Sequence, residues 1–278
     1  INYDENATVD DGSCLFIPTV TIQEIRSGEA TGLVTTTGVV TGVYLTDDGS
    51  FNGESSFTIQ NGTGALSGIW VRGPGSGADA IGNVQVGDEV ELTGTPGSNF
   101  GHEFIPNPTI TILSSGNPLP APQVLATNEA NSEDWESVLC TTTGEVTAAT
   151  ASFGFGEWGV TDGSGAARIN DRAYDALDAG VVEEGATYRV TCPIGFAYGN
   201  WKFEPRDSTD IVRLGCTDET ALNYDAAAQE DDGSCQFQVV EGCTNPDADN
   251  FNAEANVDDG SCVVTGCDDV TALNYDAT

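Results

Sequence analysis

The sequence predicts an all-β protein in which two β-barrels in tandem are flanked by small repeats that disulfides hold closed. Glycine is abundant, at 34 of 278 residues, and stretches rich in Thr and Val are separated by Gly, Asn and Asp. This pattern is typical of strands joined by tight turns. Two kinds of internal repeat, a short one with paired cysteines and a longer one of β type, predict how the chain is divided.

The short repeat occurs twice in complete form. Residues 216–235 read CTDETALNYDAAAQEDDGSC and residues 243–262 read CTNPDADNFNAEANVDDGSC. The two match at both cysteines, at an Asn followed by an aromatic residue and at the closing Asp-Asp-Gly-Ser-Cys. The chain begins with the back part of such a unit and ends with the front part. We therefore expect acidic cysteine repeats at 215–235 and 242–262, and partial repeats at 1–18 and 266–278.

The cysteine spacing within these repeats predicts two disulfides, Cys216 with Cys235 and Cys243 with Cys262, each nineteen positions apart. Closing a loop of this size stabilises a fold by about 3 kcal/mol in the chain-entropy model, and a unit of this length has little other core. The same register leaves Cys14 and Cys267 without a partner in the sequence. Further repeats, or neighbouring chains, are expected to supply those partners.

The longer repeat predicts the two barrels. VTTTGVV at 34–40 matches CTTTGEV at 140–146, and VQVGDEVELTG at 84–94 resembles VVEEGATYRVT at 181–191. The second copy also predicts a short amphipathic helix near 171–178, between its third and fourth strands. Three strands, a helix and two strands is the order of the OB fold, a small Greek-key barrel. We expect OB-type barrels at 19–116 and 124–214, joined by a Pro-rich linker at 117–123.

A third disulfide is expected inside the second barrel. Cys140 and Cys192 fall in its predicted first and fourth strands, which are neighbours in an OB sheet. The alternative is a pair of buried free thiols. The corresponding positions of the first barrel are Val34 and Gly94, so that barrel has no such bridge.

Charge is strongly one-sided, with 44 acidic against 8 basic side chains and a formal net charge of −36. Such a chain repels phosphate backbones and anionic lipid, so the sequence predicts neither nucleic acid nor membrane insertion among its partners. All eight bases lie between residues 19 and 214. The acidic ends would repel themselves unless cations neutralised them, and Ca²⁺ is the expected cofactor.

On these residues the chain resembles a known class of proteins. Residues 19–214 resemble the tandem OB-type domains of large secreted and surface proteins of Bacteroidota-like bacteria, some of them attached to extracellular nucleases. The units with NYD and DDGSC motifs are similar to Asp-rich, thrombospondin type 3-like calcium repeats of the same class. This resemblance, together with the cysteines, implies a secreted protein that is extracellular or on the cell surface.

The expected calcium ligands are oxygen-bearing side chains that recur at matching positions of the repeats. They are Asp4, Asp10, Asp11, Asp218, Asp225, Asp231, Asp232, Asn245, Asn252, Asp258, Asp259, Asp269 and Asp276. The glycine after each Asp pair permits a tight turn around an ion. The alternative is a solvated turn without metal. The spacing differs from that of an EF-hand loop.

No enzymatic activity is expected, because the chain has a single histidine, His102, which we interpret as a surface residue beside Glu103. Aromatic residues concentrate in the second barrel. Trp158, Tyr198 and Trp201 are candidates for a ligand or subunit face, with core packing as the favoured alternative.

Together these features predict an extracellular structural protein, a calcium-stabilised module of a surface fibre, filament or adhesin that self-associates into a filament or tandem array. The first alternative is a glycan-binding accessory module of a secreted enzyme that uses the aromatic face. The second is the non-catalytic part of an extracellular nuclease.

Overall fold

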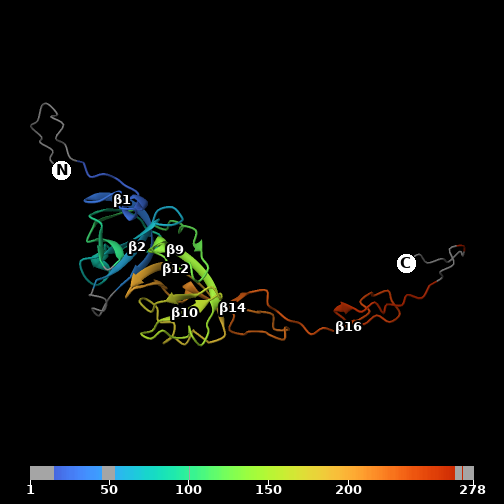
Figure 1. The fold of residues 1–278 in the computed structure, drawn as a ribbon. Coiled ribbons are helices and arrows are strands. Elements are labelled where there is room, and N and C mark those ends of the chain that lie inside the picture. Colours follow the sequence, from blue (N-terminus) through green and yellow to red (C-terminus); the bar gives the residue numbers. More distant parts are fainter. Residues whose placement is uncertain (1–15, 46–53, 100, 267–270, 272–278) are drawn as a thin grey trace, which may run out of the picture. The chain divides into compact units, whose positions relative to one another are not determined.

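A computed structural model describes residues 16–45, 54–99, 101–266 and 271 (Figure 1). The chain divides into two compact units, Ile1–Leu214 and Gly215–Thr278. The predicted all-β class is confirmed, since strands dominate both the element order and the sheets. Within the described residues, no helix is long and apolar enough to cross a membrane.

The first barrel begins with a short helix whose entry is fixed by a capping box, in which Thr21 and Glu24 bond each other's backbone. Its strands form one sheet in the order β5-β6-β3-β2-β1-β4-β7, in which β3 pairs with β6 in parallel and the other adjacent pairs are antiparallel. The elements are α1 (Ile22–Arg26), β1 (Val34–Tyr44), β2 (Ser56–Gln60), β3 (Gly68–Arg72), η2 (Ala78–Ile81), β4 (Glu89–Gly94), β5 (Gly97–Asn99), β6 (His102–Pro106) and β7 (Thr109–Ser114).

The second barrel repeats this plan. Its strands follow the order β14-β12-β13-β11-β10-β9-β8, and β12 also pairs with β9, which closes the sheet into a barrel. The parallel pair β11–β13 corresponds to β3–β6. The elements are β8 (Gln123–Val124), η3 (Glu133–Trp135), β9 (Leu139–Glu145), β10 (Trp158–Thr161), β11 (Ala166–Ile169), β12 (Thr187–Ala197), β13 (Asn200–Phe203), η4 (Ser208–Asp210) and β14 (Ile211–Gly215).

The prediction of a helix near 171–178 is wrong, because this segment forms turns. A single helical turn closes where the Ala179 amide donates to the carbonyl of Asp175. The Asp178 amide donates instead to the side chain of Asp175 at 2.9 Å. An aspartate that captures a nearby amide in this way competes with the helical hydrogen bond.

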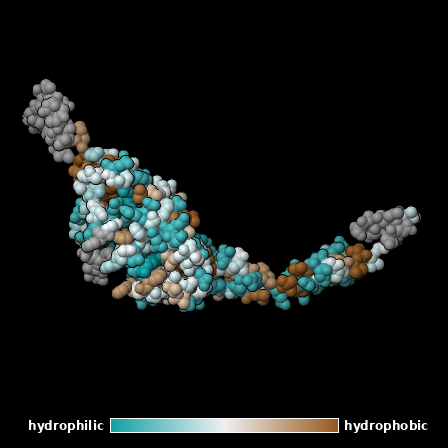
Figure 2. All heavy atoms as spheres, in the orientation of Figure 1, coloured by the Kyte–Doolittle hydropathy of each residue, from teal (hydrophilic) through white to brown (hydrophobic). Residues whose placement is uncertain are grey.

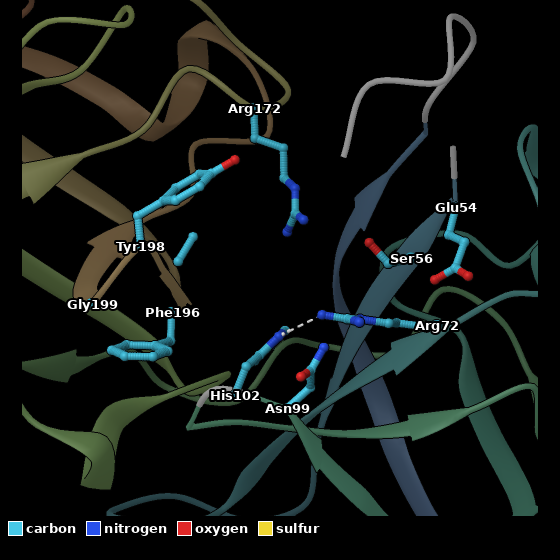
Figure 3. Close-up of a pocket in the computed structure, with 10 residues that line it drawn as sticks. Glu54, Ser56, Arg72, Asn99, His102, Arg172, Phe196, Tyr198 and Gly199 are labelled. Carbon is cyan, nitrogen blue, oxygen red and sulfur yellow. Dashed lines mark hydrogen bonds between the residues drawn. The ribbon is translucent and has the colours of Figure 1, made fainter. Parts of the chain in front are cut away.

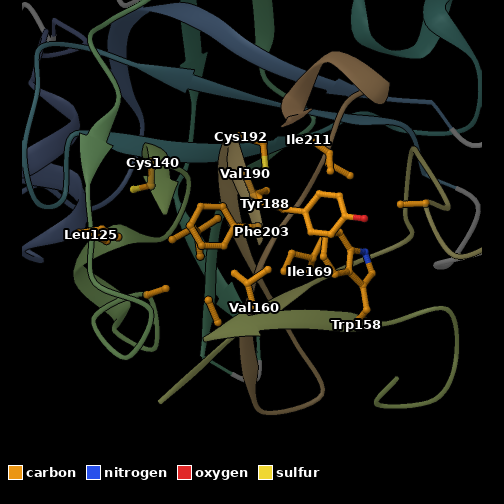
Figure 4. Close-up of a cluster of buried hydrophobic side chains, with 14 of the residues drawn as sticks. Leu125, Cys140, Trp158, Val160, Ile169, Tyr188, Val190, Cys192, Phe203 and Ile211 are labelled. Carbon is orange, nitrogen blue, oxygen red and sulfur yellow. The ribbon is translucent and has the colours of Figure 1, made fainter. Parts of the chain in front are cut away.

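Each barrel has its own apolar core, built by strands that alternate inward and outward side chains. In the second barrel Trp158 is buried and packs edge-to-face on Tyr188, with ring centroids 5.7 Å apart (Figure 4). Trp158 is therefore a core residue, and its prediction as part of a ligand or subunit face is wrong.

The bridge predicted between Cys140 and Cys192 is absent. The two residues lie directly opposite each other on β9 and β12, yet both are free and buried. Burial raises the pKa of both thiols, so they pack as small apolar side chains.

The second unit contains the two complete cysteine repeats, and both of their predicted disulfides are present, Cys216–Cys235 and Cys243–Cys262. An Asn side chain also ties the front of each repeat to its back. Asn223 donates to the carbonyl of Ser234 and accepts from the amide of Gln236, and Asn250 makes the equivalent bonds in the next repeat. The short strands here are β15 (Glu230–Asp231), β16 (Glu241–Gly242) and β17 (Val257–Asp258), and β16 pairs with β17.

Between and after these repeats, apolar side chains remain exposed. Figure 2 shows them as brown patches on the second unit. They include Phe237, Val239, Val263 and Val264.

The two barrels pack directly on each other through the outward face of β1, β2 and β3. The Gln60 side chain accepts a hydrogen bond from the Leu139 amide at 2.8 Å, and the Tyr44 hydroxyl donates to the Glu204 carbonyl at 3.1 Å. Trp70 is fully buried although it belongs to neither apolar core. The face through which an OB barrel commonly takes its ligand is thus largely covered by the second barrel.

We expect Gly68→Ala to weaken the packing between the barrels. A Cβ at Gly68 would lie 2.1 Å from the Ser137 carbonyl oxygen, a backbone atom that cannot move aside alone. Overpacking of this kind costs about 1–3 kcal/mol of the free energy of unfolding, measurable by urea denaturation. Gly97→Ala is the matched control, because a Cβ there meets nothing within 4 Å. Equal stability of the two variants would contradict the close approach of the barrels.

Candidate functional site: a pocket at the junction of the barrels

A cavity of about 490 Å³ lies where the two barrels meet (Figure 3). We call it the junction pocket. Its first-barrel wall comes from the starts of β2 and β6 and the ends of β3 and β5, and its second-barrel wall comes from the turn after β11 and the tip of the β12–β13 hairpin. The lining residues are Glu54, Ser56, Arg72, Asn99, His102, Arg172, Phe196, Ala197, Tyr198 and Gly199.

Two arginines from different barrels converge on this pocket. Arg72 ends β3, donates to Nδ1 of His102 at 2.9 Å and covers the Phe104 ring at 4.0 Å. Arg172 enters from the opposite wall, and its guanidinium lies 4.7 Å from the centroid of the Trp70 ring. Figure 3 shows both guanidinium groups directed toward the same space. The aromatic rings hold each arginine in place.

Two arginines line the pocket although the chain is strongly acidic, and their charges act on the neighbouring groups. Burial and, to a lesser extent, the charges of Arg72, Arg172 and Arg26 together lower the pKa of His102 to about 3. Burial also lowers the pKa of Arg72, and Arg172 adds to this effect. His102 is therefore a neutral acceptor for Arg72 at pH 7. The interpretation of His102 as a surface residue is wrong, because its side chain is buried against the second barrel.

A buried carboxyl group lies behind His102 and joins the pocket to the packing between the barrels. Glu136 of the second barrel is fully buried, and its Oε2 accepts from Arg26 of α1 at 2.8 Å. Its Oε1 lies 3.3 Å from Nε2 of His102. Burial raises the pKa of Glu136 to about 7, against the opposing effect of Arg26.

Aromatic side chains form the second-barrel side of the pocket. Tyr198 stands 87% exposed at the tip of the hairpin, in a left-handed conformation with φ of 53°. Phe196 lies beside it and packs on Trp201, with ring centroids 4.7 Å apart. Of the residues predicted to form an aromatic face, Tyr198 lines the junction pocket. Trp201 does not line it but packs against Phe196, which does.

The predicted calcium ligands of the complete repeats are engaged in turns. In each turn the side-chain oxygen accepts a hydrogen bond from the backbone amide two residues further on, as in an Asx turn. This holds for Asp218, Asp225, Asp231, Asp232, Asn245, Asn252, Asp258 and Asp259. The turn explains why Asp218 corresponds to Asn245 and Asp225 to Asn252, since either side chain supplies the oxygen.

No group of three or more His, Cys, Asp or Glu side chains in the described part of the chain is arranged to hold a metal ion. Calcium binding stays a prediction. Asp4, Asp10, Asp11, Asp269 and Asp276 lie outside the described residues, as do Cys14 and Cys267.

Comparison with known proteins shows likeness of fold. No protein-family profile and no curated protein matches the sequence. A solved structure described as a murine DNA-binding protein bound with double-stranded DNA is 8% identical, with 61% of this chain and 92% of that chain covered and a TM-score of 0.35. The Ifi202 HINa domain in complex with double-stranded DNA is 11% identical, with 63% and 94% covered and a TM-score of 0.33.

A replication protein A heterotrimer bound to single-stranded DNA is also similar, at 10% identity and a TM-score of 0.29, with 64% of this chain and 50% of that chain covered. These neighbours are DNA-binding proteins, which contradicts the predicted fibre or adhesin module and the filament it would form. Their descriptions name neither a glycan nor a nuclease.

The exclusion of nucleic acid as a partner is contradicted by the same neighbours. The exclusion rested on net charge, which sums over the whole chain. The field that a ligand meets in a pocket depends mainly on the nearest charges, and here two arginines and one glutamate, Glu54, line it. Sequence analysis missed both, because neither belongs to a motif.

We expect Glu136→Gln to change how stability depends on pH. The raised pKa of Glu136 makes the folded state bind more protons than the unfolded state between pH 4.5 and about 7, so the free energy of unfolding falls as pH rises there. His102 acts in the opposite sense between about pH 3 and 6.5, because its folded pKa is lowered. Without Glu136, the free energy of unfolding should rise with pH between 4.5 and 6.5.

The expected difference in slope is at most about 1.4 kcal/mol per pH unit, one full proton, measured by urea unfolding across this range. Glu133→Gln, at an exposed neighbouring position, is the control and should keep the native slope. Parallel stability curves for native protein and Glu136→Gln would show that Glu136 titrates normally.

Proposed function

We propose that the protein binds nucleic acid through the junction pocket, with a phosphate between Arg72 and Arg172 and a base against Phe196 and Tyr198. The observation that carries this is the convergence of two of the eight basic side chains of an acidic chain on one cavity. Arginine suits phosphate because its planar guanidinium donates two parallel hydrogen bonds. Exposed aromatic rings beside it offer a stacking surface for a base.

The size and depth of the pocket fit a short stretch of single strand. A volume of about 490 Å³ lies within the usual range of small-ligand sites. The base of the pocket is closed, because Trp70 and Tyr44 beneath Arg172 are buried between the barrels. A duplex would require a broader basic surface.

One carboxylate opposes this binding. Glu54 lines the first-barrel wall and its charge raises the pKa of Arg72. Glu204 also lies near Arg172, but burial raises its pKa and so disfavours its charged form. We therefore expect removal of Glu54 to increase the attraction of the pocket for anions.

The two disulfides support a location in an oxidising compartment, and we infer that the protein acts outside the cell. Its membership of the Bacteroidota-like class, calcium in the repeats and the absence of catalysis stay predictions. The second unit, with its acidic turns, plays no part in the proposed binding.

We expect Arg72→Gln and Arg172→Gln each to weaken binding of a fluorescein-labelled single-stranded oligonucleotide about tenfold or more, since a hydrogen bond to a charged group contributes roughly 1.5–3 kcal/mol. Fluorescence anisotropy at low salt measures this. With about two phosphates neutralised, the logarithm of affinity should fall with the logarithm of salt with a slope no steeper than about −1.4.

Arg213→Gln is the matched control, because it removes the same charge from an exposed ion pair with Glu183 outside the pocket. Glu54→Gln should tighten binding. Affinity that is equal in the native protein and both pocket variants, or absent at every salt concentration, would overturn the proposed function.

A further inference from the structure

Six of the eight basic side chains lie outside the junction pocket. One is Arg189 on β12, and the other five lie against a carboxylate. Arg26 lies against Glu136, Arg168 and Lys202 lie against Glu157, and further pairs join Arg206 to Asp210 and Arg213 to Glu183. A side chain already paired with a carboxylate attracts an additional anion weakly. These five side chains therefore add little to the binding of an anion at the junction pocket.

A continuous strand would have to enter and leave the pocket across the surface of a chain whose formal net charge is −36. Its flanking phosphates would meet this surface without a cation to neutralise them, and each would lose affinity instead of adding to it. The closed base of the pocket, where the Tyr44 hydroxyl bonds the Glu204 carbonyl at 3.1 Å, also prevents the strand from passing through. A strand end does not have to pass through the pocket, and only one side of it has to cross that surface.

The charge of the pocket favours one kind of end. Arg72 and Arg172 present two positive charges to the same space, and Arg172 lies near enough to disfavour the charged form of Arg72. An internal phosphodiester carries one negative charge. A terminal phosphate monoester carries about −1.5 to −2 at pH 7, with its second pKa near 6, and offers three acceptor oxygens.

We propose that the junction pocket recognises a phosphate monoester on a nucleotide, at the end of a single strand, with Arg72 and Arg172 as its clamp. This rests on the proposed function and narrows it from nucleic acid in general to phosphorylated ends. Tyr198 and Phe196 receive the terminal base. Asn99, exposed beside His102 at the rim of the pocket, provides a neutral polar neighbour.

The test compares short single strands of one sequence that carry a 5′-phosphate, a 3′-phosphate or only hydroxyl ends, together with a circular strand that has no end. Each competes against the labelled oligonucleotide on the full chain. We expect one phosphorylated end to compete about tenfold or more better than the hydroxyl form. The circular strand should compete no better than the hydroxyl form. The advantage should grow as pH rises from about 5 to 7, when the monoester gains its second charge.

Arginine variants distinguish recognition of the phosphorylated end by Arg72 and Arg172 from a general electrostatic effect of the protein's basic residues. In Arg172→Gln the preference for a phosphorylated end should vanish, whereas Arg213→Gln should retain it. Circular dichroism of each variant checks that the barrels remain folded, and Glu54→Gln should increase affinity for the phosphorylated end without any loss of packing. A nucleoside monophosphate that competes with the same arginine dependence would support the inference and identify the free nucleotide as a second source of the ligand.

Two results would contradict this inference, and only the second would also contradict the proposed function. If circular, hydroxyl and phosphorylated strands all bind equally and Arg172→Gln weakens all of them alike, the end preference is wrong while nucleic-acid binding stands. If none of the strands binds under any condition, both the inference and the proposed function fall.

Discussion

The packing of the two barrels on each other is the constraint on which the rest of this protein depends. It buries an arginine and a carboxyl group together, Arg26 and Glu136, with both side chains fully shielded from solvent. It also requires a glycine at Gly68, where the two backbones approach. A buried pair of charges is costly unless each is well partnered, so this contact specifies one arrangement of the barrels more than it adds stability. Without that arrangement, Arg72 and Arg172 would belong to separate surfaces.

The same contact changes what an OB barrel can offer a ligand. Trp70 and Tyr44 stack at 4.9 Å on the outward face of the first barrel, where an open barrel would expose them to a strand. Here they support Arg172 from below and leave only the rim of that face open. The junction pocket is consequently small and closed at its base, and two arginines line it on a molecule whose net charge is −36.

The all-β class and the two disulfides of the repeats could be predicted from the sequence, because strand alternation and cysteine spacing are local patterns. It was insufficient wherever partners come from distant segments. His102 becomes buried only because the second barrel covers it, and no feature near residue 102 announces this. Trp158 and Tyr198 are both aromatic residues in β-rich segments, and the sequence does not distinguish their roles. Trp158 points into the core from β10, whereas Tyr198 is exposed at the tip of the β12–β13 hairpin. The recurring Asp and Asn of the repeats gave a strong pattern whose observed role is local turn formation.

The central claim is that one ligand is held by both barrels at once. Hydrogen–deuterium exchange of the full chain, with and without a saturating phosphorylated single strand, tests it most directly. The account predicts simultaneous protection of three segments, the end of β3 at Arg72, the start of β6 at His102 and the β12–β13 hairpin at 196–199, with residues 215–266 unchanged. Protection confined to one barrel, or to the cysteine repeats, would contradict it.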